Sequence, residues 1–337
     1  MKNLYYSQFP QGFNKLVEEI IKNTTSNAVK QLDEDYLLHE TSLSPTTIAN
    51  LDYLECSYFI IKFFETDFNI DNQLNWFNKN IKQIVIQINK EKIFKNKSFR
   101  VVVSVARKHS AIYNPVVSEA ERNISQYIKV ERGTPDFEIR LIEKKGYGFI
   151  GIRISKTREY TDDFYKNSVR KEIAYFMNYL SEIRDSDIFI DPMCGGGMIP
   201  ILRSKMGKYK KIVACDNKMN NFRNKLRILK KQGIEFYNFE EYQCGIKELP
   251  NRIKYKVNKI VTDPPWGLVQ KVNDINKFYR DIFEVFGRIC DKGAVVVVLV
   301  NNEELVRDNI GKSFEVKEVV FFMISSTSLL NPCGNCE

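Results

Sequence analysis

The heptapeptide VTDPPWG, residues 261–267, places a carboxylate, two prolines and a tryptophan directly after a strand-like run. Each proline lacks a backbone N–H and fixes its own φ, so Pro264 and Pro265 end the strand and stiffen the corner that follows. Asp263 can accept hydrogen bonds or take up a proton at this point. Trp266 offers a flat face on which an aromatic ring can stack. The corner could therefore act on a flat polar ligand, although a simple cap and turn would also explain it.

A second candidate site is the glycine-rich stretch DPMCGGG, residues 191–197, between a strand-like run and a helical one. Glycines allow a backbone to approach a ligand closely, and the first turn of the following helix offers free N–H groups. Asp191, Gly195 and Gly197 give the D-x-x-x-G-x-G form found in S-adenosylmethionine enzymes. A dinucleotide fingerprint requires a third glycine where Pro200 stands, which argues against NAD. A tight turn without a ligand is the remaining alternative.

The carboxylate of Asp216 ends the next strand-like run, 19 residues beyond Gly197. At that spacing an acidic side chain can accept hydrogen bonds from both hydroxyls of a ribose. In a parallel sheet, the carboxyl ends of neighbouring strands lie at one edge, where ligands bind. The glycine-rich stretch, Asp216 and the DPPW corner are therefore expected to meet at this edge.

The elements that must position these residues alternate between strands and helices from residue 156 onward. Helical stretches separate four strand-like runs: DIFID at 187–191, KIVACD at 211–216, VNKIVTD at 257–263 and GAVVVVLV at 293–300. This alternation predicts an α/β fold with a parallel, doubly wound sheet.

Two smaller regions precede this sheet. Residues 1–97 mix strand-like runs with helical spacing and predict a small α+β domain that ends near the polar linker KNKS. Residues 98–155 predict a strand, a helix over residues 116–130 capped by Ser118, and a hairpin turned around residues 144–147.

Composition narrows the class of protein further. The chain has 337 residues, of which 43% are hydrophobic and 28% charged, so it is globular and long enough for two or three domains. Its longest apolar run, residues 294–300, is far shorter than a membrane span, and the N-terminus lacks the features of a signal peptide. Seven scattered cysteines fit a reducing cytoplasm. The net charge of +9 favours a polyanionic partner, although an AT-rich genome would also enrich lysine.

These residues resemble those of a known family. TDPPWG is similar to the motif of amino-group methyltransferases, in which Asp, Asn or Ser precedes two prolines and an aromatic residue. Residues 98–155 resemble a THUMP domain, the RNA-binding module that receives the tRNA acceptor end. Residues 10–20 resemble the start of the ferredoxin-like domain that precedes it, and residues 162–180 the segment that joins THUMP to the catalytic domain. Nearly the whole chain resembles the THUMP-containing tRNA guanine-N2 methyltransferases.

The resemblance implies a ferredoxin-like domain at 1–97, a THUMP domain at 98–155 and a Rossmann-fold methyltransferase domain at 156–337. It implies S-adenosylmethionine-dependent methylation of a guanosine N2 amine in tRNA, with position 10 favoured over position 6 by the chain's length and by the Asp of the corner. Together with the motifs it gives two sets of site residues: for cofactor binding Asp191, Met193, Cys194, Gly195, Gly197, Asp216, Asn217 and Gly245, and for catalysis Asp263, Pro264, Pro265 and Trp266.

Three positions depart from the family pattern. Gly245 replaces the acid that binds the adenine amine, Lys171 replaces a linker proline, and Gly196 replaces a frequent Thr or Ser of the cofactor loop. Two alternatives stay open. One is an RNA-binding protein with a degenerate methyltransferase domain, and the other is an amino-methyltransferase that acts on rRNA, DNA adenine or a protein glutamine.

Several other features carry secondary expectations. Cys333 and Cys336 form a C-x-x-C pair, but a structural zinc site needs four ligands, so no metal is expected. Cys194 is expected to be a packed side chain and not a nucleophile. A monomer is favoured. The loop around His109 approaches phosphate or is an ordinary surface loop. Five basic residues form either a phosphate track or a solvated face: Arg107, Lys108, Arg122, Lys129 and Arg132.

Overall fold

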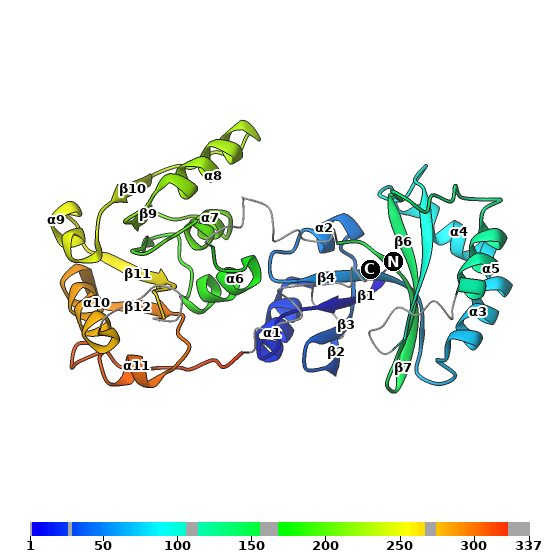
Figure 1. Ribbon diagram of the computed structural model, residues 1–337, viewed down its shortest axis with the longest axis horizontal. Coiled ribbons are helices and arrows are strands. Elements are labelled where there is room, and N and C mark those ends of the chain that lie inside the picture. Colours follow the sequence, from blue (N-terminus) through cyan, green and yellow to red (C-terminus); the bar gives the residue numbers. More distant parts are fainter. Residues whose placement is uncertain (1, 26–28, 106–113, 156–167, 267–273, 323–337) are drawn as a thin grey trace. The chain divides into compact units, whose positions relative to one another are not determined.

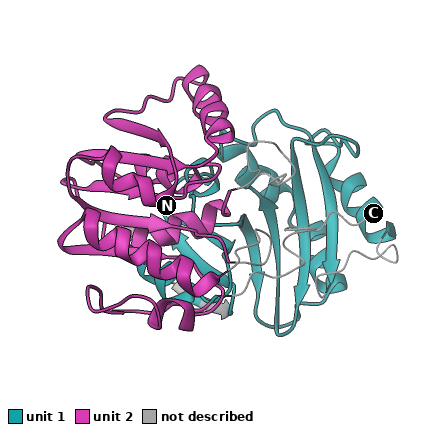
Figure 2. Cartoon of the chain, turned by 60° about the vertical axis from the view of Figure 1, so that its left-hand side comes forward, with its two compact units in different colours: residues 1–158, 322–337 teal, residues 159–321 magenta. Residues whose placement is uncertain are grey.

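Two β-sheets organise this chain, and each belongs to its own unit (Figure 1). The first unit comprises residues 1–158 with 322–337, and the second comprises residues 159–321 (Figure 2). The computed structural model describes the chain from residue 2 to residue 322 with four gaps, at residues 26–28, 106–113, 156–167 and 267–273.

The first unit is built on a seven-stranded mixed sheet with the order β2-β3-β1-β4-β7-β6-β5. Its strands are β1 (Asn3–Gln8), β2 (Val29–Asp33), β3 (Tyr36–Thr41), β4 (Cys56–Phe64), β5 (Phe99–Val105), β6 (Phe137–Lys144) and β7 (Tyr147–Arg153). The predicted hairpin is confirmed, since β6 and β7 pair antiparallel up to Lys144 and Tyr147. Because β4 pairs with β7, residues 1–97 and 98–155 contribute to the same sheet. The division of this unit into a ferredoxin-like and a THUMP domain stays a prediction.

The described part of the first unit contains five α-helices: α1 (Asn14–Thr25), α2 (Pro45–Ala49), α3 (Ile70–Lys79), α4 (Ile81–Lys90) and α5 (Asn114–Ile124). Asn80 ends α3 and immediately precedes α4. The expected N-cap at Ser118 is wrong, because α5 begins at Asn114 and Ser118 lies inside it. Pro115 accounts for the earlier start, since proline fits the first turn of a helix, where the N–H groups have no partner.

The second unit contains a five-stranded parallel sheet with the order β10-β9-β8-β11-β12. Its strands are β8 (Ile188–Asp191), β9 (Lys211–Asp216), β10 (Phe239–Gln243), β11 (Val257–Thr262) and β12 (Cys290–Val298). The predicted α/β fold and its four strands are confirmed, and β10 adds a fifth strand at the edge. From the central β8 the chain runs to β9 and β10 on one side and then to β11 and β12 on the other. Ligands bind at such a switch point, beyond the carboxyl ends of the strands.

Helices cover both faces of this sheet. They are α6 (Lys171–Leu180), α7 (Met198–Lys205), α8 (Asn220–Lys231), α9 (Leu249–Arg252), α10 (Ile275–Ile289) and α11 (Glu304–Arg307), with a 3₁₀ turn at Ile246–Glu248. Ile201 of α7 and Phe222 of α8 form one core with Ala214 of β9. Phe286 of α10 belongs to the other core, together with Val213 of β9. Alternate residues of β9 therefore serve the two cores, as in any strand that is buried on both faces.

Candidate active site

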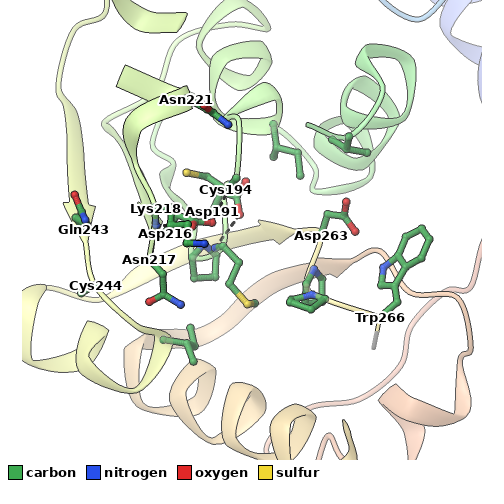
Figure 3. A pocket seen from close by; sticks show the side chains of 18 of the residues that line it. Asp191, Cys194, Asp216, Asn217, Lys218, Asn221, Gln243, Cys244, Asp263 and Trp266 are labelled. Carbon is green, nitrogen blue, oxygen red and sulfur yellow. Dashed lines mark hydrogen bonds between the residues drawn. The ribbon is translucent and has the colours of Figure 1, made fainter. Parts of the chain in front are cut away.

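A cavity of about 1200 Å³ lies at the carboxyl ends of β8, β9, β10 and β11 (Figure 3). Ten predicted site residues line it: Asp191, Met193, Cys194, Gly195, Asp216, Asn217, Asp263, Pro264, Pro265 and Trp266. Figure 3 shows Asp216, Asn217 and Gln243 toward one end of the pocket and Asp263 and Trp266 toward the other. The structure thus brings the glycine-rich stretch, the end of β9 and the DPPW corner to one pocket. The roles assigned to these residues stay predictions.

The glycine-rich stretch connects β8 to α7 through a turn that requires glycine. Gly197 precedes α7 with a left-handed φ of 78°, and a Cβ at this position would lie 2.0 Å from Cδ2 of Phe222. Only glycine satisfies both constraints without a shift of α8. Gly197 is not among the residues that line the cavity, so it shapes the turn from behind. The Cys194 N–H donates to the Cys215 carbonyl at 2.8 Å and holds the stretch against the end of β9.

Two backbone N–H groups fix the carboxylate of Asp216. Its Oδ2 accepts the Gly195 N–H at 2.8 Å, and its Oδ1 accepts the Lys218 N–H at 2.9 Å. A carboxylate oxygen can accept more than one hydrogen bond, so both oxygens keep the capacity to accept from a ligand. The arrangement suits a pair of ribose hydroxyls presented from the pocket.

The DPPW corner begins where β11 ends at Thr262. Burial raises the pKa of the Asp263 carboxyl to about 7, and the neighbouring Trp266 indole opposes part of this rise. The indole N–H of Trp266 donates to the Leu299 carbonyl at 3.2 Å, which holds the ring at the pocket. A carboxyl that titrates near neutral pH can take up a proton from a reacting amine and release it to water afterwards.

Asp191 is fully buried at the end of β8. Its Oδ1 accepts the Met193 N–H at 3.2 Å, whereas Oδ2 has no hydrogen-bond partner in the described part of the chain. Burial raises the pKa of this carboxyl well above its ordinary value; the Thr262 hydroxyl and the Met193 N–H oppose the rise, and the charges of Asp216 and Asp263 add to it. Among the described residues, no lysine or arginine forms an ion pair with any of these three carboxylates.

The residues of the pocket fit S-adenosylmethionine, which carries a sulfonium and an ammonium group. The ionised carboxylates of the pocket supply negative charge that no described cation neutralises in an ion pair, and the unpartnered Oδ2 of Asp191 can accept from a donor of the ligand. Asp216 would hold the ribose. The cavity of about 1200 Å³ leaves room for a substrate base beside the cofactor.

Gly245 is the second predicted residue that does not line the cavity, whereas its neighbours Cys244 and Ile246 do. Its φ of −74° does not require glycine. Motif reasoning also missed several lining residues: Val169, Pro192, Ile199, Lys218, Asn220, Asn221, Gln243 and Phe278. Lys218 lies two residues after the end of β9, and Gln243 ends β10, so both could have been predicted from their places at strand ends. Val169 precedes α6, and Phe278 lies on α10. No local sequence pattern connects either residue with the pocket.

Cys194 is a packed side chain, as expected. It belongs to the core between α7 and α8, and its Sγ lies 3.9 Å from Sδ of Met219. Burial and the nearby carboxylates raise the pKa of its thiol well above the ordinary value, so the thiol stays protonated. A nucleophilic cysteine would require the opposite shift.

Other sequence features fall partly outside the described residues. Cys333, Cys336 and the basic loop of Arg107, Lys108 and His109 lie in undescribed segments. Arg132 forms an ion pair with Glu121 at 2.7 Å, so it is engaged within the first unit. No group of His, Cys, Asp or Glu suited to a metal ion occurs among the described residues. None of the helices in the described ranges has the length and hydrophobicity needed to cross a membrane.

The parallel sheet, the glycine turn and the pocket at the carboxyl ends of the strands define a Rossmann-like methyltransferase fold. Residues 158–330, just over half of the chain, match the family of the RMKL-like methyltransferase domain, and the chain belongs to this family. Membership of a methyltransferase family agrees with the predicted cofactor, S-adenosylmethionine.

Relatives extend the similarity beyond this domain. The tRNA (guanine(10)-N2)-dimethyltransferase of Methanocaldococcus jannaschii is 24% identical over 299 residues, which cover 80% of this chain and 82% of that protein. The tRNA (guanine(6)-N(2))-methyltransferase THUMP3 of Mus musculus is 26% identical over 224 residues, 61% of this chain and 44% of that protein. The crystal structure of TrmN from Thermus thermophilus has a TM-score of 0.74 at 16% identity and covers 96% of both chains. The predicted resemblance to THUMP-family guanine-N2 methyltransferases is confirmed.

Proposed function

We propose that this chain methylates the N2 amine of a guanosine in tRNA, with S-adenosylmethionine as methyl donor. The observation that carries the proposal is the DPPW corner, where a carboxyl with a pKa of about 7 and an anchored indole ring line the cofactor pocket. Guanine N2 is conjugated into the ring, so it is a weak nucleophile and needs an acceptor for its hydrogens. The corner offers two acceptors, the Asp263 carboxylate and the Pro264 carbonyl.

The residues of the corner divide the work of the reaction. S-adenosylmethionine supplies an electrophilic methyl group on its sulfonium. The guanine stacks on Trp266, while Asp263 and the Pro264 carbonyl accept the two N2 hydrogens and turn the lone pair toward the methyl group. When N2 takes up the methyl group, the amine would lose one proton, which Asp263 would accept and pass to water. Burial of the corner keeps Asp263 basic enough for this transfer near neutral pH.

The N-terminal unit is proposed to deliver the tRNA, through a ferredoxin-like region at 1–97 and a THUMP region at 98–155. Support comes from the 80% coverage of this chain by the relative named for guanine 10. Coverage does not separate the two positions, because a relative named for guanine 6 matches 61% of this chain and a second one named for guanine 10 matches 46%. Position 10 is proposed from the chain's length and the Asp of the DPPW corner.

Mass spectrometry of tRNA nucleosides tests this function. Tritiated S-adenosylmethionine and unmodified tRNA should yield N2-methylguanosine with the wild-type protein, and primer extension on the product should locate it at position 10. In Trp266→Ala the loss of a stacking face worth about 1–3 kcal/mol should reduce turnover, whereas Trp266→Phe should recover much of it. Methylation of another base, or none with tRNA, would refute the proposal.

Gly245 motivates one competing function, an RNA-binding protein with a degenerate methyltransferase domain. That protein would bind tRNA without measurable affinity for S-adenosylhomocysteine. Calorimetry with S-adenosylhomocysteine alone decides between the two functions before any activity is measured.

A further inference from the structure

The positive charge of this chain is concentrated in one segment of the second unit. Residues 205–231 contain ten of the chain's 51 lysine and arginine residues. The same segment contains a single acidic residue, Asp216, of the 42 in the chain. The excess of nine cations in this segment equals the net charge of +9 of the whole chain, so the remainder of the chain is balanced. A lysine-rich composition alone would spread the excess along the chain.

Seven of the ten cations are exposed and form no ion pair with a described residue: Lys205, Lys208, Lys210, Lys218, Arg227, Lys230 and Lys231. Lys205, Lys208 and Lys210 precede β9 at the amino edge of the sheet, whereas Lys218 follows β9 and Arg227, Lys230 and Lys231 lie on α8. We call these last four side chains the cationic surface. The other three are engaged within the unit, because Lys211 and Arg223 pair with glutamates and Lys225 is buried against Ser168.

Stability of α8 does not explain this arrangement. The helix contains no acidic residue between Asn220 and Lys231. Arg223, Arg227 and Lys231 are spaced by four residues, and like charges at this spacing destabilise a helix. The helix dipole compensates the two lysines of the last turn, but it does not reach Arg227 or Lys218. A polyanion would neutralise all four side chains of the cationic surface at once.

The cationic surface starts at the rim of the pocket. Lys218 lines the cavity together with Asn220 and Asn221 at the start of α8. The helix then carries the charge away from the rim over about 17 Å, at roughly 1.5 Å per residue, along the periphery of the unit (Figure 1). Tyr237, which is 68% exposed in the turn after α8, adds a ring on which a base can stack. This geometry suits a charged polymer of which one residue enters the pocket.

We propose that the cationic surface binds the phosphate backbone of the RNA substrate, next to the nucleotide that is methylated. The proposal rests on the proposed function and deepens it, because it assigns an RNA contact to the methyltransferase unit itself. RNA fits better than an anionic membrane, since Ile228 is the one large apolar side chain that α8 exposes. The contact is independent of base sequence, because it reads phosphate charge.

A triple variant of the full chain tests the surface: Arg227→Gln, Lys230→Gln and Lys231→Gln. These residues lie outside the pocket, and glutamine preserves helix propensity. The matched control removes the same charge from exposed lysines of the same unit that form no ion pair with a described residue, by Lys254→Gln, Lys292→Gln and Lys312→Gln. Affinity for an unmodified tRNA transcript is measured by fluorescence anisotropy between 50 mM and 400 mM KCl. Calorimetry with S-adenosylhomocysteine checks that the pocket is intact.

The α8 variant should bind tRNA about 10- to 100-fold more weakly at 0.1 M salt, and the slope of log K against log salt should fall by about 2 to 3. The control should lose less than about threefold, and both variants should bind S-adenosylhomocysteine like the wild type. Equal tRNA binding by the α8 variant and the control would contradict RNA binding by the cationic surface, and it would leave the proposed function unaffected. A wild-type chain without tRNA affinity would sink the proposed function and the surface together. Loss of binding to phosphatidylglycerol vesicles, with tRNA binding unchanged, would assign the surface to a membrane and reject RNA.

Discussion

Both edges of the five-stranded sheet bury charged side chains. Among the described residues, a buried carboxylate forms an ion pair at the amino edge but not at the carboxyl edge. There Arg203 and Asp187 are both fully buried and form an ion pair at 2.9 Å. The Arg203 guanidinium also donates to the carbonyls of Arg184 at 3.2 Å and Lys208 at 3.1 Å. Lys259 is buried nearby and donates to the Ser181 carbonyl. The charges of Arg203 and Asp187 are matched within the protein, and Lys259 has a carbonyl as its partner.

At the carboxyl edge, Asp191 and Asp263 have no described cation as partner, and burial raises the pKa of both carboxyls. Buried atoms without a hydrogen-bond partner among the described residues occur at both edges, namely Oδ2 of Asp191, Oδ1 of Asp187 and Nε of Arg203, so the difference between the edges lies in charge. Unpaired buried carboxylates cost stability, so their retention points to a ligand that supplies the missing positive charge. A sulfonium cofactor and an amine that gives up a proton both meet this requirement. The amino edge therefore holds its buried carboxylate in an ion pair, and the carboxyl edge is the one proposed to use its carboxyls for binding and catalysis.

The largest expected effect on stability comes from removing one partner of the buried ion pair at the amino edge. Asp187→Ala leaves the Arg203 guanidinium buried without its carboxylate, which should lower the free energy of unfolding by about 3–5 kcal/mol. At the other edge, Asp191→Asn removes an uncompensated carboxyl and should leave stability unchanged or higher. Urea denaturation of the two variants and the wild type provides the comparison. Equal destabilisation by both substitutions would show that the two edges do not differ in the proposed way.

Catalysis should respond most to Asp263→Asn. The amide fits the corner but cannot take up a proton, so kcat should fall on the order of 10²-fold or more while tRNA affinity is kept. Single-turnover kinetics at saturating tRNA measures the step directly. The wild-type rate should rise with pH through about 7, because Asp263 must be ionised to act as a base. A variant that retains the wild-type rate would reduce the corner to a structural turn.

Asp263→Asn should also change the pH dependence of stability, in a direction that follows from the raised pKa of Asp263. The raised pKa of Asp263 in the folded state gives a contribution that is complete below the unfolded pKa of about 4 and is lost as the pH rises to about 7. Asp263→Asn removes this dependence. The melting temperature of the variant should therefore exceed that of the wild type by an amount that grows from pH 4 to pH 7 and then levels off. A difference that shrinks over this range would contradict the raised pKa.

A smaller effect is expected at Asp216, which accepts hydrogen bonds from two backbone N–H groups of the protein and is proposed to hold the ribose of the cofactor. Asp216→Ala should weaken binding of S-adenosylmethionine by about 1.5–3 kcal/mol, through loss of charge-assisted hydrogen bonds. Asp216→Asn retains one acceptor oxygen and should lose less. Wild-type affinity of the alanine variant in calorimetry would exclude this strand end from the cofactor site.

The sequence predicted the apolar strands of this sheet better than the polar one. β8, β9 and β11 are recognisable because a parallel strand buried on both faces is a nearly continuous apolar run. β12 is a half-exposed edge strand, but its run of four valines still predicts it. β10, with the sequence FEEYQ, is the half-exposed strand at the other edge and lacks that pattern. The pocket followed from its strand ends and from the glycine turn, where local chemistry is decisive. Val169 and Phe278 reach it only through tertiary packing, which no local pattern reports.

The smallest expected effect concerns Gly245, where the family pattern expects an acid that binds the adenine amine. The φ of −74° accepts any L-residue, and a Cβ would lie 3.4 Å from Oδ1 of Asn217, a lining residue, and 3.9 Å from Oε1 of Glu248. Gly245→Asp can therefore place a carboxylate beside the end of the pocket where Asn217 lies. One added hydrogen bond of about 1 kcal/mol should tighten binding of S-adenosylhomocysteine by about fivefold. Gly245→Asn is the matched control, and its neutral amide should give less than the carboxylate. Calorimetry that finds no gain with aspartate would show that the adenine amine does not reach this turn, and the chain would then recognise adenine by contacts that the family pattern does not contain.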